Sequence, residues 1–164
     1  MPQPSFAAQY RLIKYEATGI NYYHAYKNTC FVCSAASLLA LTGENIVTIS
    51  GSGIIDLTCK FFADGPLFPV MQWPITAKGQ SPQTAPPATL TLEDHDSFQL
   101  SIIGETPIIV SRQKDSFVFH QNRREIAHIR QAGPQNSDAF TFLPLMPLTT
   151  ALILAFPMLY SHCP

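Results

Sequence analysis

Residues 140–160, FTFLPLMPLTTALILAFPMLY, contain no charged side chain. Proline is tolerated in the first turn of a helix, where its missing N–H has no partner, and it disrupts a helix interior. Pro147 therefore marks the start of a hydrophobic C-terminal helix of about 147–160, and Pro157 marks a kink or the end of it. Because this helix is apolar all round, the sequence predicts that it is buried on every side.

The same stretch has a second interpretation as a membrane anchor, since about 20 apolar residues span a bilayer. A helix from Leu148 to Tyr160 would be about 20 Å long, whereas the hydrocarbon core is about 30 Å thick. No Lys or Arg flanks it to set an orientation in a membrane. We therefore expect a core helix, and a tail-anchored membrane protein with a cytoplasmic β-domain is the alternative.

Most of the chain before this helix has the pattern of short strands separated by turn residues. The expected strands are Phe6 to Tyr15, Asn45 to Ser50, Ile54 to Phe62, Leu67 to Trp73, Thr89 to Glu93, Phe98 to Ile103, Ile108 to Ser111, Ser116 to His120 and Arg124 to Ile129. Short strands at intervals of about 8 to 12 residues are typical of an antiparallel barrel or sandwich. The predicted fold is mainly β: a single antiparallel β-barrel of about ten to twelve short strands around the C-terminal helix.

Residues 29–42, TCFVCSAASLLALT, fit a strand or a helix, and we predict a strand. Residues 74–88 have the Pro-rich composition of a long loop. We expect one domain, 1–164, with this loop joining halves 1–73 and 89–164. The similar phrases ENIVTI and REIAHI, one in each half, support the hypothesis that the halves are a degenerate repeat.

The composition excludes two classes of protein. Only 13% of residues are charged and 46% are hydrophobic, which is incompatible with intrinsic disorder. A net charge of −1 gives no protein-wide field that would attract nucleic acid. Four cysteines are too few for a disulfide scaffold, and Met1 to Gln9 lacks the charge of an export signal. We therefore predict a cytoplasmic protein with reduced cysteines.

The order of elements near the C-terminus resembles that of a known superfamily. A hairpin over Ser116 to Ile129, a linking strand and an apolar helix over Leu148 to Leu159 follow one another. This order is similar to the tubby C-terminal-like superfamily, in particular the small LURP-one-related proteins and, more distantly, the phospholipid scramblases. The resemblance is best over residues 108–160. It implies a closed barrel of about twelve strands around one hydrophobic helix, and association with phosphoinositides and membranes.

Two features of the chain depart from that superfamily. Its members often place an acidic residue near the end of the helix, where this chain has Pro157 to Tyr160. The acidic calcium-binding stretch of the scramblases has no counterpart, because Asp138 is the only acid after Glu125. A calcium site needs several oxygen ligands. We therefore do not expect calcium-triggered lipid scrambling, and we predict no metal or other cofactor.

Charge is unevenly distributed despite its near-zero total. Residues 89–111 carry four acidic and no basic side chains, a net charge of −4. Residues 112–130 carry five basic side chains against two acidic ones, a net charge of +3; the basic residues are Arg112, Lys114, Arg123, Arg124 and Arg130. Such a patch fits anionic lipid headgroups. The structural alternative is that neighbouring strands pair opposite charges across their solvent face.

Cys30 and Cys33 form a C-x-x-C motif, which in redox enzymes lies at a helix N-terminus that lowers the thiol pKa. In a strand, residues three apart point to opposite faces and cannot act together. A zinc site would need two further ligands at a suitable spacing. We expect buried structural cysteines, and a thiol-based redox protein is the alternative.

The sequence shows neither a G-x-S-x-G motif nor a glycine-rich phosphate loop. We therefore predict a non-catalytic binding or scaffold module of the tubby-like type, with an anionic membrane lipid or a protein as partner and no nucleic acid. The expected location is the cytoplasm, with peripheral association at membranes. The oligomeric state is not encoded in any motif of the sequence.

Overall fold

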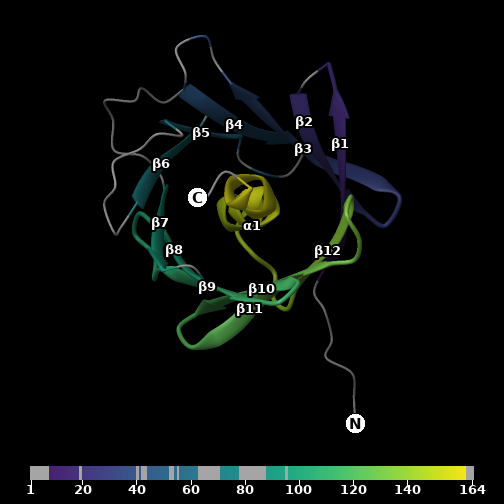
Figure 1. Ribbon diagram of the computed structural model, residues 1–164. Coiled ribbons are helices and arrows are strands. Elements are labelled where there is room, and N and C mark those ends of the chain that lie inside the picture. The colour runs from purple at the N-terminus through teal and green to yellow at the C-terminus, as the bar shows by residue number, and fades with distance from the viewer. Residues whose placement is uncertain are drawn as a thin grey trace.

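A computed structural model of the chain describes residues 8–18, 20–39, 41, 44–51, 54, 56–62, 71–77, 88–94 and 96–161. Its elements are β1 (Ala8–Ala17), β2 (Ile20–Lys27), β3 (Cys30–Leu39), β4 (Glu44–Gly51), β5 (Leu57–Phe62), β6 (Met71–Ala77), β7 (Ala88–Asp94), β8 (Ser97–Ile102), β9 (Ile108–Gln113), β10 (Ser116–Gln121), β11 (Arg124–Gln131), β12 (Asn136–Thr141) and α1 (Pro147–Tyr160). Each strand pairs antiparallel with the next, and β1 pairs with β12, so the sheet closes into a barrel (Figure 1). The prediction of an antiparallel β-barrel of about ten to twelve strands is confirmed, with twelve strands.

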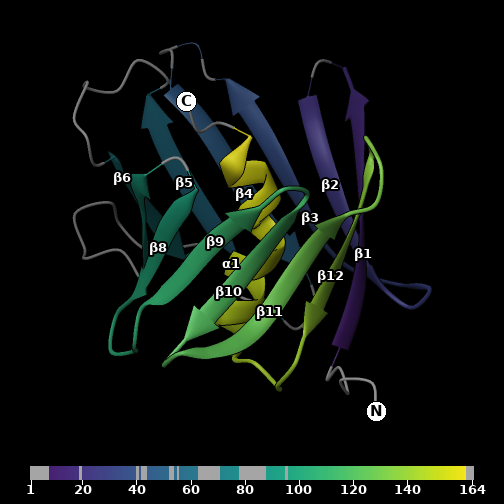
Figure 2. The ribbon, with the colours of Figure 1, turned by 60° about the horizontal axis from the view of Figure 1, so that its bottom comes forward.

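The C-terminal helix lies inside the barrel, as the sequence predicts. Figures 1 and 2 show α1 enclosed by the ring of strands. Ten of its residues are buried, from Thr149 to Leu159. A helix surrounded by inward-facing strand residues has no polar side, which explains the absence of charge along α1.

Phe156 of α1 is the centre of an aromatic cluster in this core. Its ring lies 5.4 Å from that of Phe98, 5.0 Å from Phe117 and 5.3 Å from Phe119, all edge to face. These three rings belong to β8 and β10, in which alternate residues face the barrel axis. Helix and strands thus share one core, in which edge-to-face geometry is favoured for aromatic pairs.

The length of α1 separates the two interpretations of the apolar stretch. The helix has 14 residues, and among the described residues no helix is both long and apolar enough to cross a bilayer. The enclosure of α1 by strands supports the core helix over the tail anchor.

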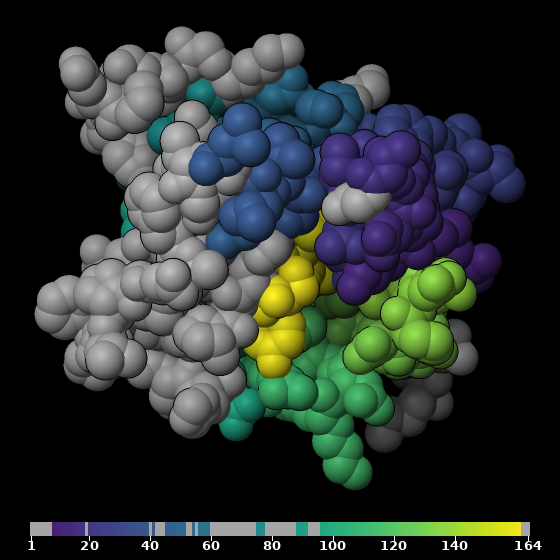
Figure 3. All heavy atoms as spheres, turned by 45° about the horizontal axis from the view of Figure 1, so that its top comes forward, coloured from purple at the N-terminus to yellow at the C-terminus, as the bar shows by residue number. Residues whose placement is uncertain are grey.

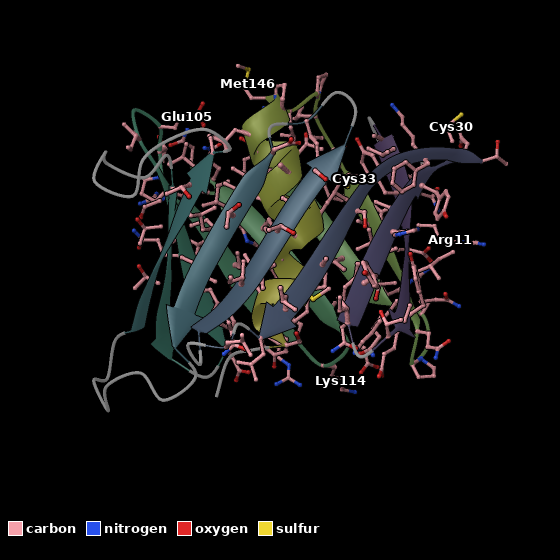
Figure 4. The ribbon with its side chains drawn as sticks, turned by 90° about the horizontal axis from the view of Figure 1, so that it is seen from above. Arg11, Cys30, Cys33, Glu105, Lys114 and Met146 are labelled. Carbon is pink, nitrogen blue, oxygen red and sulfur yellow. The ribbon has the colours of Figure 1, made fainter. Side chains whose placement is uncertain are left out.

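The barrel has two rims, which α1 defines. We call the rim at which α1 ends the C-rim; it carries the connections β1–β2, β3–β4, β9–β10 and β11–β12. The opposite rim, at which α1 begins, is the N-rim and carries the connections β2–β3, β8–β9 and β10–β11. Figure 4 shows Lys114 at the C-rim and Met146 and Glu105 at the N-rim.

Some boundaries differ from the predicted ones. The strand predicted within 29–42 is confirmed as β3, whereas β2 was not predicted. The prediction of a loop over 74–88 is wrong at both ends, because residues 74–77 belong to β6 and Ala88 belongs to β7; residues 78–87 lie outside the described ones. Pro74 precedes Ile75, the first β6 residue that pairs with β5, and itself pairs with Thr89 of β7.

Pro157 does not end the helix. α1 continues to Tyr160, and the N–H of Ser161 donates to the carbonyl of Pro157. The similar segments ENIVTI and REIAHI lie in β4 and β11. The internal repeat stays a prediction.

Candidate functional site

The structure divides the five basic residues of the predicted patch into three places. Arg112 is the second-last residue of β9 and Lys114 begins the β9–β10 turn, so both lie at the C-rim. Arg123 and Arg124 lie at the β10–β11 turn, at the N-rim. Arg130 lies near the end of β11 on the outer face of the barrel. The five do not form one surface.

The length of β10 causes this separation. Its six residues connect the two turns, and at about 3.3 Å per residue they hold them roughly 17 Å apart. Asn122 and Arg123 form the tight turn at the N-rim with φ of 53° and 62°. A two-residue turn with both φ values positive matches the twist of the flanking strands. The basic residues are therefore close in sequence and distant in space.

Arg130 has a structural partner. Its Nη2 lies 3.5 Å from Oδ2 of Asp138 on β12, and the Nε of Arg11 on β1 lies 4.0 Å from Oδ1 of the same carboxylate. Its guanidinium carbon also lies 5.9 Å from the ring centre of Phe140. For Arg130 the prediction of charge pairing between neighbouring strands is confirmed, and Asp138, which Arg130 shares with Arg11, offsets part of its charge.

Arg112 is placed differently, because it shares the inward side of β9 with Ile108 and Val110. At the rim its side chain extends over the end of α1, and its guanidinium carbon lies 5.4 Å from the ring centre of Tyr160. The Tyr160 ring in turn packs 4.8 Å from that of Phe117. A guanidinium over a tyrosine ring is held by a cation–π interaction and keeps its N–H groups available.

A cleft of about 220 Å³ opens at this point between the end of α1 and the barrel wall. Its lining consists of Tyr23, Arg112, Lys114, Asp115, Phe117, Ile129, Gln131, Ser137, Pro157, Tyr160 and Ser161. Figure 3 shows the yellow end of α1 in a hollow between the purple β1–β2 region, the yellow-green β11–β12 connection and the green β9–β10 connection. The cleft gathers two of the five predicted residues and excludes the other three.

The cleft combines an apolar floor with a polar, mostly cationic rim. Phe117, Ile129 and Pro157 form apolar surface, whereas Arg112 and Lys114 supply two positive charges against the one carboxylate of Asp115. Burial raises the pKa of Tyr23, so its hydroxyl stays protonated and can donate a hydrogen bond. These groups suit a ligand with an anionic end and a less polar part.

Comparison of the chain with protein-family models, with curated proteins and with solved structures gives no match. The resemblance to the tubby-like superfamily therefore stays a prediction. The functional argument rests on the residues of the cleft.

The geometry of the C-x-x-C motif does not favour thiol chemistry. The expected burial is confirmed for Cys33 and wrong for Cys30, which is exposed at the N-rim, where Figure 4 shows it pointing away from the barrel. Burial raises the pKa of the Cys33 thiol to about 12, opposite to the lowered pKa of a redox nucleophile. Among the described residues, no three His, Cys, Asp or Glu side chains come together as metal ligands.

An aromatic cluster on the outer face of β1–β3 was not predicted. It consists of Tyr15, Tyr22, His24, Tyr26 and Phe31. The Tyr15 hydroxyl is hydrogen-bonded to the ring of His24, whose pKa is lowered by partial burial. Tyr15 and Tyr22 are stacked, and most of the other ring pairs meet edge to face, so the rings pack against one another. The alternation of Tyr22, His24 and Tyr26 along one strand was the available sequence signal.

Proposed function

We propose that this protein is a non-catalytic binding module whose C-rim cleft takes the anionic headgroup of a membrane phospholipid. The observation that carries the proposal is the arrangement of Arg112 over Tyr160, beside Lys114, at the mouth of a cleft with an apolar floor. The predicted resemblance to the tubby-like superfamily agrees with this class of ligand.

The separation of the basic residues makes the proposal specific. Each Lys or Arg near an anionic membrane contributes about 1 kcal/mol to binding. Arg112 and Lys114 share the cleft, whereas Arg123 and Arg124 lie at the N-rim. If the cleft is the site, loss of the first pair weakens binding and loss of the second pair does not, although both changes remove two charges.

The test is co-sedimentation with vesicles of phosphatidylcholine containing phosphatidylserine or a phosphoinositide, at low salt. We expect Arg112→Gln with Lys114→Gln to weaken binding about thirtyfold, from two contributions of about 1 kcal/mol each. Arg123→Gln with Arg124→Gln is the matched control, with an expected change of less than about twofold. Equal losses in the two double variants would show attraction by net charge alone and would refute the cleft as the site.

Two further variants test the surroundings of the cleft. Asp115→Asn removes the one carboxylate of the lining and is expected to strengthen binding. Arg130→Gln removes a cation that already pairs with Asp138 and is expected to leave binding nearly unchanged. Absence of binding to all anionic vesicles by the unmodified protein would refute the proposed function itself.

A further inference from the structure

The β3–β4 hairpin carries leucines that have no place in the core. Leu39 is 67% exposed and Leu41 is 109% exposed, and Leu38 beside them is also exposed. Soluble proteins leave single apolar side chains on their surface, but three large ones within four residues at the tip of a hairpin are a concentrated apolar feature. The barrel does not need them for packing.

These leucines lie at the same rim as the cleft. β3 and β9 both run toward the C-rim, because successive strands alternate in direction and an even number of steps along the chain separates the two. Around the barrel, the β3–β4 connection is opposite the β9–β10 connection. Twelve strands about 4.8 Å apart and tilted by about 40° make a barrel roughly 25 Å across. The C-rim therefore has leucines on one side and Arg112 and Lys114 on the other, and the cleft lies on the side of the two cations, between the end of α1 and the barrel wall.

We infer that the C-rim docks onto an anionic bilayer with the β3–β4 tip inserted among the lipids. This inference rests on the proposed function and adds an orientation and an inserted segment to it. A bilayer presents negative charge at its surface and apolar chains directly beneath it. The exposed Leu39 and Leu41 match the apolar layer, and the cations across the opening match the charged one.

The N-rim supplies a matched control for exposed apolar side chains. Ile103 in the β8–β9 connection and Met146 before α1 are each 64% exposed. Figure 4 shows Met146 at the rim opposite Lys114. If apolar exposure alone drove membrane binding, Ile103 and Met146 would contribute as much as Leu39 and Leu41. If the C-rim docks, they contribute nothing.

The first experiment measures the depth of insertion. Leu41→Trp and Met146→Trp are each mixed with phosphatidylcholine–phosphatidylserine vesicles that contain lipids brominated on their acyl chains, and the signal of the unmodified protein, which has Trp73, is subtracted. We expect the fluorescence of the Leu41→Trp variant to shift to shorter wavelength and to be quenched, and that of the Met146→Trp variant to stay unchanged. Quenching at residue 146 instead of residue 41 would overturn the inference.

The second experiment measures affinity. We expect Leu39→Gln with Leu41→Gln to lower partitioning into these vesicles at least about a hundredfold, because each of the two leucines loses apolar burial that corresponds to about tenfold or more. Ile103→Gln with Met146→Gln should change partitioning less than about twofold. Urea unfolding of both double variants checks that the barrel is intact.

The two proposals fail in different ways. If the unmodified protein binds the vesicles but residue 41 is neither shifted nor quenched, the inserted tip is wrong and the headgroup site stands. If the unmodified protein does not bind them, both are wrong. If the tip leucines prove necessary only for association of the protein with itself or with another protein, the surface is a protein interface and the inference is overturned.

Discussion

Gly51, the last residue of β4, lies where the backbone of β3 leaves no room for a side chain. A Cβ at this position would lie 2.6 Å from the Cα of Cys33 and 2.5 Å from its Cβ. Atoms of neighbouring strands do not approach this closely, so any larger residue must push β3 and β4 apart. The closed barrel limits how far two strands can separate, because every strand has a partner on both sides.

We therefore expect Gly51→Ala to lower the free energy of unfolding by about 2 kcal/mol, within the range of overpacking substitutions. Gly133 in the β11–β12 connection is the control, since a Cβ there meets no atom within 4 Å. Gly133→Ala should change stability by less than about 0.5 kcal/mol. Urea denaturation measures both, and equal midpoints for the two variants would contradict the close approach at Gly51.

Cys33 makes stability depend on alkaline pH. Burial raises the pKa of its thiol from 9.0 to about 12, so the unfolded chain loses this proton at lower pH than the folded protein does. The stabilising effect is complete below about pH 9 and is lost as pH rises through the folded pKa. From this group alone we expect a loss of about 1.4 kcal/mol between pH 8 and pH 10.

The measurement is urea unfolding at both pH values for the unmodified protein, Cys33→Ala and Cys30→Ser. Between pH 8 and pH 10, Cys33→Ala should lose about 1.4 kcal/mol less stability than the unmodified protein. Cys30→Ser should lose as much as the unmodified protein, because Cys30 is exposed. An identical pH dependence in all three proteins would mean that Cys33 ionises as readily in the folded state as in the unfolded one.

At the scale of elements, α1 is the interior of the barrel. Its buried residues supply apolar surface to the inward faces of the strands, and one buried large aliphatic side chain contributes about 1.5–3 kcal/mol. Six large apolar side chains of α1 are buried, so together they contribute about as much as the whole net stability of about 5–15 kcal/mol that is typical of a domain. We expect that a chain ending at Met146 shows no cooperative unfolding transition.

A point substitution tests the same element in the full-length chain. Leu152→Asp places an unpaired carboxylate at a position with no solvent exposure and should abolish the folded state, whereas Met146→Asp, at the exposed start of α1, should have little effect. Circular dichroism and urea unfolding report both. A native-like, cooperatively unfolding barrel without α1 would restore the tail anchor as the better interpretation of residues 147–160.

A strand could be predicted from the sequence where its buried face is clearly the more apolar one. β8 alternates buried and half-buried positions and was predicted nearly to the residue. β2 was missed because large rings lie on both of its faces: Tyr22, His24 and Tyr26 on the outer face, and Tyr23 beside Ala25 on the inner one. Alternation predicts a half-buried strand only when one face is clearly more apolar than the other. In β2 the aromatic residues do not mark the buried face.

At the scale of the whole molecule, the sequence predicts the class of fold but not the site. The enclosed helix follows from one uncharged stretch, because a helix without a polar side is buried either in a core or in a membrane, and this one is too short to span a bilayer. The cleft depends on the pairing of β9 with β10 and on the point at which Tyr160 ends α1. The spacing of charges along the sequence predicts neither of these features. The five basic residues that were predicted as one patch therefore lie in three separate places.

Closure of the barrel also leaves no free strand edge between β1 and β12. β1 pairs with β12 over Ala8 to Ile13 and Asn136 to Thr141, so the first and last strands cover each other's backbone groups. A free strand edge would present unpaired N–H and C=O groups to other molecules. The pairing joins segments more than 120 residues apart, and contacts of such long range form slowly in folding.

The order of the elements has a consequence for how the protein is made. All twelve strands precede α1 in the chain, so the ribosome synthesises the whole wall of the barrel before the residues that fill it. During that interval the inward faces of the strands have no native partner, and exposed apolar strands are prone to aggregate. The nascent chain is therefore expected to depend on a chaperone that shields those faces until α1 has been translated, and to fold late and all at once.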